Sequence, residues 1–140
     1  MDVAVNDPKT VAWVLDGPKV LAVVGLSDNP ERPSYRVSAE MQRRGYRIVP
    51  VNPKGGEILG EKVYTSLREI PFPVDVVQVF RAPQYALDVV REIGEMVARP
   101  RVLWMQEGVV NDEAVAAAEA LGLLTVQDRC LYKEALNAQG

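Results

Sequence analysis

The chain contains no histidine and a single cysteine, and these two counts restrict the chemistry open to it. Without an imidazole there is no Ser-His-Asp or Cys-His nucleophile system, no histidine base and no phosphohistidine. A metal site would have only Cys130 and carboxylates to draw on, so we expect none. Because one cysteine excludes an internal disulfide, we expect a reducing, cytoplasmic location. These counts favour binding over catalysis.

One stretch offers binding chemistry, because a buried strand runs into a glycine turn and then into a helix. Val20–Val24 is an unbroken apolar run that stops at Gly25, and a helical pattern begins near Ser34. The first N–H groups of a helix lack internal partners and attract anions. We therefore predict a phosphate-binding corner. Ser27 and Ser34 bond either phosphate oxygens or local backbone groups, and both interpretations remain open here.

The loop after the second expected strand indicates the type of nucleotide. The Gly-x-Gly-x-x-Gly fingerprint of dinucleotide domains is matched only at Gly25, since Ser27 and Pro30 occupy the other two positions. Where an NAD domain carries a carboxylate for the ribose, this sequence has Asn52 and Lys54. A lysine there suits a ribose phosphate, which both NADP and coenzyme A carry, or it is simply a solvated loop residue.

The overall charge argues against nucleic acid as a partner, because the net charge is −3 and the pI is near 5.0. A local cluster of Arg32, Arg36 and Lys54 can still bind a small polyanion. Arg81 either neutralises a diphosphate or forms a structural ion pair with Asp128. No apolar run approaches the roughly 20 residues of a membrane span, so we expect no membrane partner.

Strands and helices alternate along the chain, which is typical of a parallel α/β sheet. The expected strands are Val20–Val24, Arg47–Val51, Val74–Phe80, Arg101–Met105 and Leu123–Val126. The expected helices are a short one that begins at Pro8 and is ended by Gly17-Pro18, and then Ser34–Arg44, Pro83–Met96, Asp112–Ala120 and Leu131–Ala138. Between residues 57 and 73 we expect only a short extended piece near Val63 and one turn, and we expect Pro50 to end the bonding of the second strand.

These elements predict a single α/β domain over residues 1–140. Its expected architecture is a Rossmann-like three-layer sandwich around a five-stranded parallel sheet of order 3-2-1-4-5. Right-handed crossovers bring the carboxyl ends of all strands to one edge. We expect the ligand at that edge, at the switch between strands 1 and 4.

The residues at this edge resemble those of the small stand-alone coenzyme A-binding proteins. That family is similar to the N-terminal domain of the succinyl-coenzyme A synthetase α-subunit. The segments that carry the resemblance are Val23–Tyr35, Gly45–Lys54, Val74–Arg81, Trp104–Gly108 and Asp128–Cys130. The resemblance extends from about Lys19 to Glu134, which is nearly the whole expected domain.

The resemblance implies a Rossmann-type fold with coenzyme A at the sheet edge. In the synthetase domain, the first turn and the loop after the second strand hold the nucleotide end of coenzyme A. By that match, the binding residues are Gly25, Ser27, Pro50, Asn52, Pro53 and Lys54. Arg32 and Ser34 belong to a loop that departs from the synthetase's glycine-rich loop, and with Arg81 they complete the expected site.

The synthetase reaction needs a second domain with a phosphorylated histidine and a nucleotide-binding partner subunit, and this sequence has no histidine. We therefore expect a non-catalytic protein that binds coenzyme A or an acyl-coenzyme A, with a protein partner in some roles. The alternatives are a small NADP-dependent oxidoreductase, an acyl-coenzyme A enzyme, or an interaction protein without a ligand. Cys130 is expected to be a buried structural cysteine.

Overall fold

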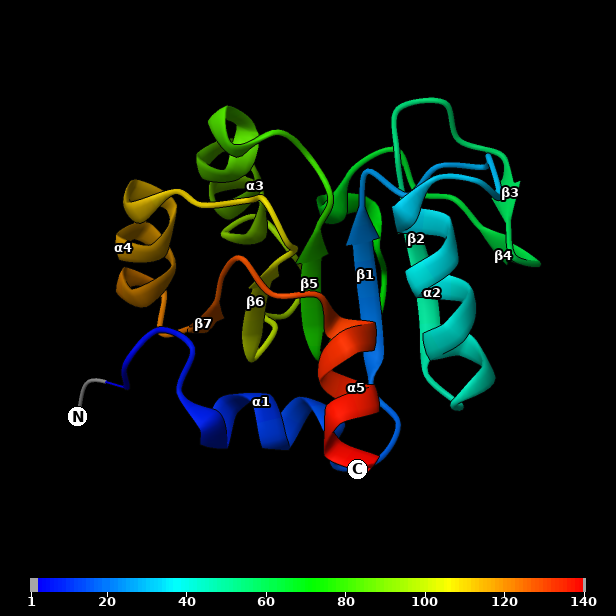
Figure 1. Ribbon diagram of the computed structural model, residues 1–140. Coiled ribbons are helices and arrows are strands. Elements are labelled where there is room, and N and C mark those ends of the chain that lie inside the picture. Colours follow the sequence, from blue (N-terminus) through cyan, green and yellow to red (C-terminus); the bar gives the residue numbers. More distant parts are fainter. Residues whose placement is uncertain (1–2, 140) are drawn as a thin grey trace.

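The computed structural model describes residues 3–139 and shows one central parallel sheet between two layers of helices (Figure 1). The sheet contains β1 (Val20–Val24), β2 (Arg47–Val51), β5 (Val76–Val79), β6 (Val102–Met105) and β7 (Leu124–Val126). The helices are α1 (Pro8–Leu15), α2 (Pro33–Arg43), α3 (Ala86–Ile93), α4 (Asp112–Ala120) and α5 (Leu131–Gln139). The expected α/β class and layered architecture are confirmed.

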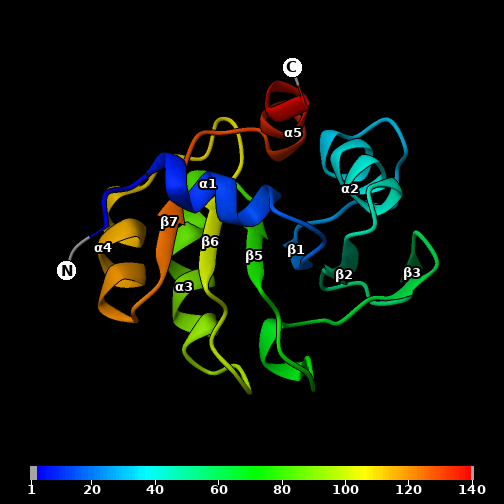
Figure 2. The ribbon, with the colours of Figure 1, turned by 90° about the horizontal axis from the view of Figure 1, so that it is seen from below.

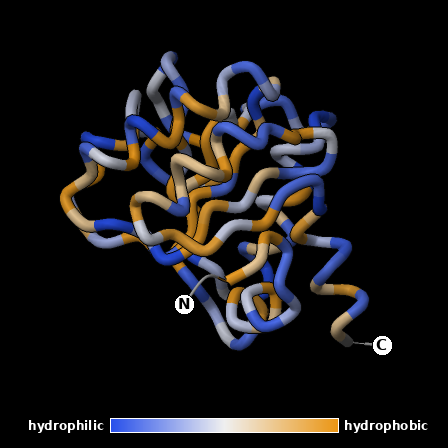
Figure 3. The backbone as a smooth tube through the Cα atoms, turned by 90° about the vertical axis from the view of Figure 1, so that its left-hand side faces the viewer, coloured by the Kyte–Doolittle hydropathy of each residue, from blue (hydrophilic) through white to orange (hydrophobic). Residues whose placement is uncertain are grey.

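The two faces of the sheet bury different helices. Strand residues alternate between the faces, so that Ala22 and Val24 pack with α3 and α4, whereas Leu21 and Val23 pack with α1, α2 and α5. Figure 2 shows α1, α2 and α5 on one side of the strands and α3 on the other. Because the strands are buried on both faces, their sequences are nearly continuous apolar runs. Figure 3 shows these hydrophobic stretches inside the molecule and the hydrophilic ones in the outer loops.

The strand order places β1 between β2 and β5, beside the switch in strand order. The order is β2-β1-β5-β6-β7, which reads 2-1-3-4-5 when these five strands are counted along the chain. Tyr64 forms an isolated parallel bridge to Val51 on the open side of β2. With that rudimentary strand counted as the third, the order is the expected 3-2-1-4-5, followed by β7. The strand at Val74–Phe80 is then the fourth rather than the third, and the switch lies between β1 and β5.

The helix boundaries follow from capping. The Asp7 side chain accepts from the Lys9 N–H at the start of α1, and the Asn111 side chain accepts from the Ala114 N–H at the start of α4. The expected helix from Pro83 begins instead with a 3-10 turn, η2 (Pro83–Tyr85), before α3. Among residues 3–139, no helix is long and apolar enough to cross a bilayer.

Two expectations about the region after β1 need correction. Pairing with β1 continues through Val51, because Pro50 sits at a position whose backbone faces the open side of β2, where its carbonyl accepts from the Tyr64 N–H. Proline therefore costs β2 no hydrogen bond to β1. The connection after β2 also contains a small antiparallel hairpin, β3 (Glu57–Ile58) and β4 (Glu61–Lys62), which precedes the expected turn, η1 (Leu67–Glu69).

Candidate functional site

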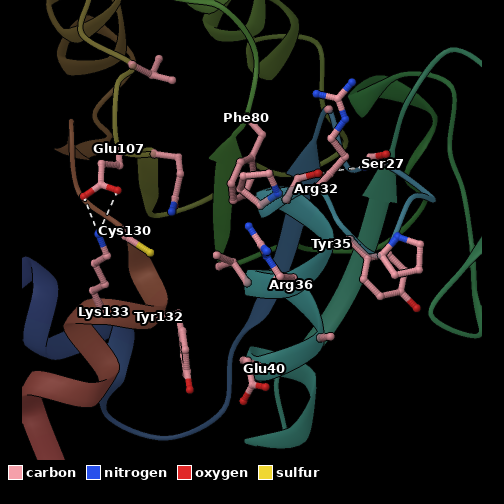
Figure 4. Close-up of a pocket in the computed structure, with 18 of the residues that line it drawn as sticks. Ser27, Arg32, Tyr35, Arg36, Glu40, Phe80, Glu107, Cys130, Tyr132 and Lys133 are labelled. Atoms are coloured by element: carbon pink, nitrogen blue, oxygen red, sulfur yellow. Dashed lines mark hydrogen bonds and ion pairs between the residues drawn. The ribbon is translucent and has the colours of Figure 1, made fainter.

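A cleft of about 1180 Å³ lies between α2 and α5, and we call it the α2–α5 cleft (Figure 4). It opens at the carboxyl edge of β1, β5 and β6. Its walls include residues of the β1 turn, of α2, of the ends of β5 and β6, and of α5. The residues used below are Gly25, Ser27, Arg32, Ser34, Arg36, Val37, Phe80, Gln106, Glu107, Val109, Cys130, Tyr132, Lys133 and Leu136.

Gly25 is required by the close approach of two strand ends. Its φ is +88°, and a Cβ at this position would lie 3.1 Å from the backbone oxygen of Phe80. Its N–H donates to the Val51 carbonyl at 2.9 Å. The β1 turn is therefore held tightly between β2 and β5, and the structure gives Gly25 a packing role at this edge.

The two serines of the expected phosphate corner hold the β1–α2 loop. The Ser27 N–H donates to Ser34 Oγ at 3.0 Å, and Ser27 Oγ accepts from the Asn29 N–H at 3.0 Å. Both serines line the α2–α5 cleft, and Ser34 is buried. Since each oxygen serves as an acceptor within the loop, each hydroxyl hydrogen stays free to donate to a ligand.

Two arginines at the start of α2, the N-cap residue Arg32 and Arg36 in the helix, give the cleft its positive charge. Arg32 and Arg36 are one helical turn apart, are exposed, and form no ion pair within residues 3–139. Figure 4 shows Arg36 directed from α2 into the cleft. On the opposite wall, Lys133 is 3.1 Å from Glu107, and the bond to that carboxylate raises the pKa of the Lys133 ammonium. The net positive charge of these residues therefore comes from the two arginines.

The loop after β2 reaches the β1 turn through Asn52. Its Nδ2 donates to the Leu26 carbonyl at 3.1 Å, and its Oδ1 accepts from the Lys54 N–H at 2.8 Å. Pro50 is buried in β2, whereas Pro53 and Lys54 are exposed. None of these residues lines the α2–α5 cleft. They lie on the β2 side of the β1 turn, so the expected site residues occupy two adjoining regions.

Arg81 lies beside the β1 turn, because its Cγ would be 3.2 Å from a Cβ placed on Gly25. Its guanidinium lies 4.3 Å from the centroid of the Tyr85 ring. The alternative ion pair with Asp128 is wrong, because none joins these two side chains in the described structure; Asp128 Oδ1 accepts from the Gly108 N–H at 2.8 Å. Arg81 forms no ion pair with any carboxylate of the described residues.

The sequence interpretation missed a buried pair of amides below the cleft. Gln106 Oε1 accepts from Gln78 Nε2 at 3.0 Å, and also from the Leu131 N–H at the start of α5 at 3.5 Å. Gln78 is fully buried, and Gln106 is 5% exposed. The available signal was that each glutamine interrupts or directly follows an apolar strand. Cys130 is buried as expected, with 9% exposed, and it lines the same cleft.

The chain is similar to known proteins both in sequence and in fold. Residues 19–135 match the family model described as a CoA binding domain. "Uncharacterized protein YneT" of Bacillus subtilis is 44% identical over 118 residues, which span 84% of this chain and 86% of that protein. A solved structure described as a hypothetical protein from Pyrococcus horikoshii OT3 has a TM-score of 0.88 and 32% identity, with 100% of this chain and 99% of that chain covered.

A further relative is much longer. The acetate–CoA ligase (ADP-forming) I subunit alpha of Pyrococcus furiosus is 37% identical over 87 residues. The matched region spans 58% of this chain and 19% of that subunit.

Proposed function

The chain belongs to the CoA binding domain family, and on that premise we propose that it binds coenzyme A or an acyl-coenzyme A without catalysing a reaction of its own. The proposed binding unit is a single domain over residues 1–140. The nucleotide end of the ligand lies at the carboxyl edge of the sheet, across the switch between β1 and β5. Since the single cysteine is a free, buried thiol, we assign the protein to the reducing cytoplasm.

The observation that carries this proposal is a group of cations without carboxylate partners around the β1 turn. Arg32, Arg36, Lys54 and Arg81 form no ion pair within residues 3–139. The whole chain has a net charge of −3, so a positive edge is not a consequence of composition. Unpaired cations beside a glycine turn and a helix start favour a ligand that carries several phosphates.

We assign the ribose phosphate and the diphosphate of coenzyme A to different cations of this group. Lys54 follows β2, where a Rossmann-type domain meets the ribose, so it is assigned to the ribose phosphate. Arg81 and Arg32 flank the β1 turn and are assigned to the diphosphate, together with the hydroxyls of Ser27 and Ser34. Asn52, with Pro50 and Pro53 on either side, holds the Lys54 backbone in place through its two hydrogen bonds.

The absence of histidine supports the non-catalytic part of the proposal. The sequence has no histidine, and Glu107, a carboxylate that lines the same cleft as Cys130, is paired with Lys133 at 3.1 Å. Cys130 is therefore not paired with a base that would activate it.

Calorimetric titration of the purified protein with coenzyme A, dephospho-coenzyme A, NADP and NAD tests the proposal. We expect coenzyme A to bind most tightly, dephospho-coenzyme A more weakly, and NAD very weakly or not at all. Tighter binding of NADP than of coenzyme A would favour the oxidoreductase alternative. No heat with any of the four ligands, confirmed by equilibrium dialysis, would overturn coenzyme A binding itself.

A further inference from the structure

The amide of Gln106 is only half used by the protein. Its Oε1 accepts from Gln78 Nε2 and from the Leu131 N–H, which fixes the orientation of the side-chain amide. Its Nε2 makes no hydrogen bond among residues 3–139. Since Gln106 is 5% exposed and lines the α2–α5 cleft, these two N–H donors have only the cleft in which to find an acceptor.

Gln78 shows that this arrangement costs the protein stability. Its side chain is fully buried, and its Oε1 has no hydrogen-bond partner. By donating to Gln106, Gln78 leaves its own oxygen unsatisfied in the core. A buried amide whose nitrogen orients a neighbouring amide while its own oxygen stays unsatisfied is more typical of a binding site than of a structural core.

Apolar side chains line the α2–α5 cleft together with Gln106, and they indicate the kind of acceptor that fits. Val37, Phe80, Val109 and Leu136 contribute to the walls, while the cationic residues Arg32 and Arg36 lie along α2. Because the amide donor is neutral, the ligand acceptor need not be a charged carboxylate. An uncharged carbonyl that is attached to a hydrocarbon chain satisfies the donor and fills the apolar space.

We propose that the α2–α5 cleft receives the acylated end of the pantetheine arm and that Gln106 Nε2 donates to the thioester carbonyl. The preferred ligand class is therefore an acyl-coenzyme A with an uncharged aliphatic acyl group, rather than free coenzyme A. This inference rests on the proposed binding of coenzyme A. The cleft begins at Gly25 and Ser27 of the phosphate corner and continues to Leu136 on α5, so one extended ligand spans both regions.

The test compares two ligands of equal charge and nearly equal shape, butyryl-coenzyme A and S-butyl-coenzyme A, which differ by the thioester carbonyl. One neutral hydrogen bond corresponds to about a three- to tenfold preference for the thioester in the wild-type protein. In Gln106→Glu, Oε1 keeps both of its donors, but an acceptor replaces the Nε2 donor. We expect the preference for the thioester to disappear, whereas any general effect of the added charge cancels in the ratio.

Gln106→Met is the second variant, because it removes the amide without adding charge, and it should also give equal affinities for the two ligands. Circular dichroism and thermal melting establish that each variant is folded, and one folded variant is sufficient. Equal affinities in the wild-type protein, or an unchanged preference in a folded variant, would overturn the assignment of Gln106. If coenzyme A binds but the thioester has no advantage, only this inference fails. If no coenzyme A derivative binds, the proposed function fails with it.

Discussion

Replacement of Lys54 by alanine tests the assignment of the ribose phosphate most directly. The side chain is exposed and forms no ion pair in the described structure, so Lys54→Ala removes no intramolecular interaction and should leave the melting temperature unchanged. A hydrogen bond between charged groups contributes about 1.5–3 kcal/mol. Because this lysine is solvent-exposed, the lower end of that range applies, which corresponds to about a tenfold loss of affinity for coenzyme A.

The assay is a cycle of two proteins and two ligands, measured by calorimetry at fixed salt. Dephospho-coenzyme A lacks the ribose phosphate, so its affinity should be nearly the same for the wild type and Lys54→Ala. The matched control is Lys9→Ala, since Lys9 is an exposed lysine on α1, away from the sheet edge that binds the ligand. Equal losses for the two ligands in Lys54→Ala, or equal affinities of the wild type for both, would refute the assignment.

Three further outcomes are expected. Gly25→Ala should lower the free energy of unfolding by about 1–3 kcal/mol, because φ is +88° and the new Cβ would meet the Phe80 oxygen at 3.1 Å; chemical denaturation measures this, and an unchanged midpoint would contradict it. Cys130→Ser should change coenzyme A affinity less than about threefold. Mild oxidation should produce a coenzyme A adduct in the wild type that mass spectrometry does not find in Cys130→Ser. Burial raises the pKa of the Tyr46 hydroxyl above 10.0, so its contribution to folding stability is complete below pH 10 and is lost as the pH rises further. Thermal melts across that pH range should therefore show a smaller alkaline loss of stability in Tyr46→Phe than in the wild type.

Local signals in the sequence account for most of the fold. The Asp7-Pro8 pair begins α1 as predicted, and the apolar run Val20–Val24 is β1 with the same boundaries. The hairpin of β3 and β4 was missed, because Glu57–Ile58 and Glu61–Lys62 are too short to show an alternating pattern. Tertiary packing, rather than local propensity, determines whether such short segments pair.

The candidate site was predictable where it depends on loops and unpredictable where it depends on packing. The position of Gly25 at the switch between β1 and β5 follows from the order of strands and helices. The α2–α5 cleft, in contrast, exists because Leu131 and Ala135 on α5 pack on the same face of the sheet as α2. Nothing local indicates that Gln106 and Gln78 are neighbours, since 28 residues separate them in the chain.

The short polar residues and the long cationic residues at the β1 turn make different kinds of contact. Ser27, Ser34 and Asn52 use their side chains to hold the loops at the β1 turn, and the hydroxyl hydrogens of the two serines stay available for a ligand. The long cationic side chains beside them, those of Arg32 and Arg81, make no such bonds to carboxylates. The short residues therefore fix the loops at the edge, and the charged residues contribute no ion pair to that framework. Since screening weakens exposed charge interactions, raising the salt concentration should reduce coenzyme A affinity in the wild type and have a smaller effect on dephospho-coenzyme A. Equal salt dependence for both ligands would mean that the ribose phosphate does not meet these cations.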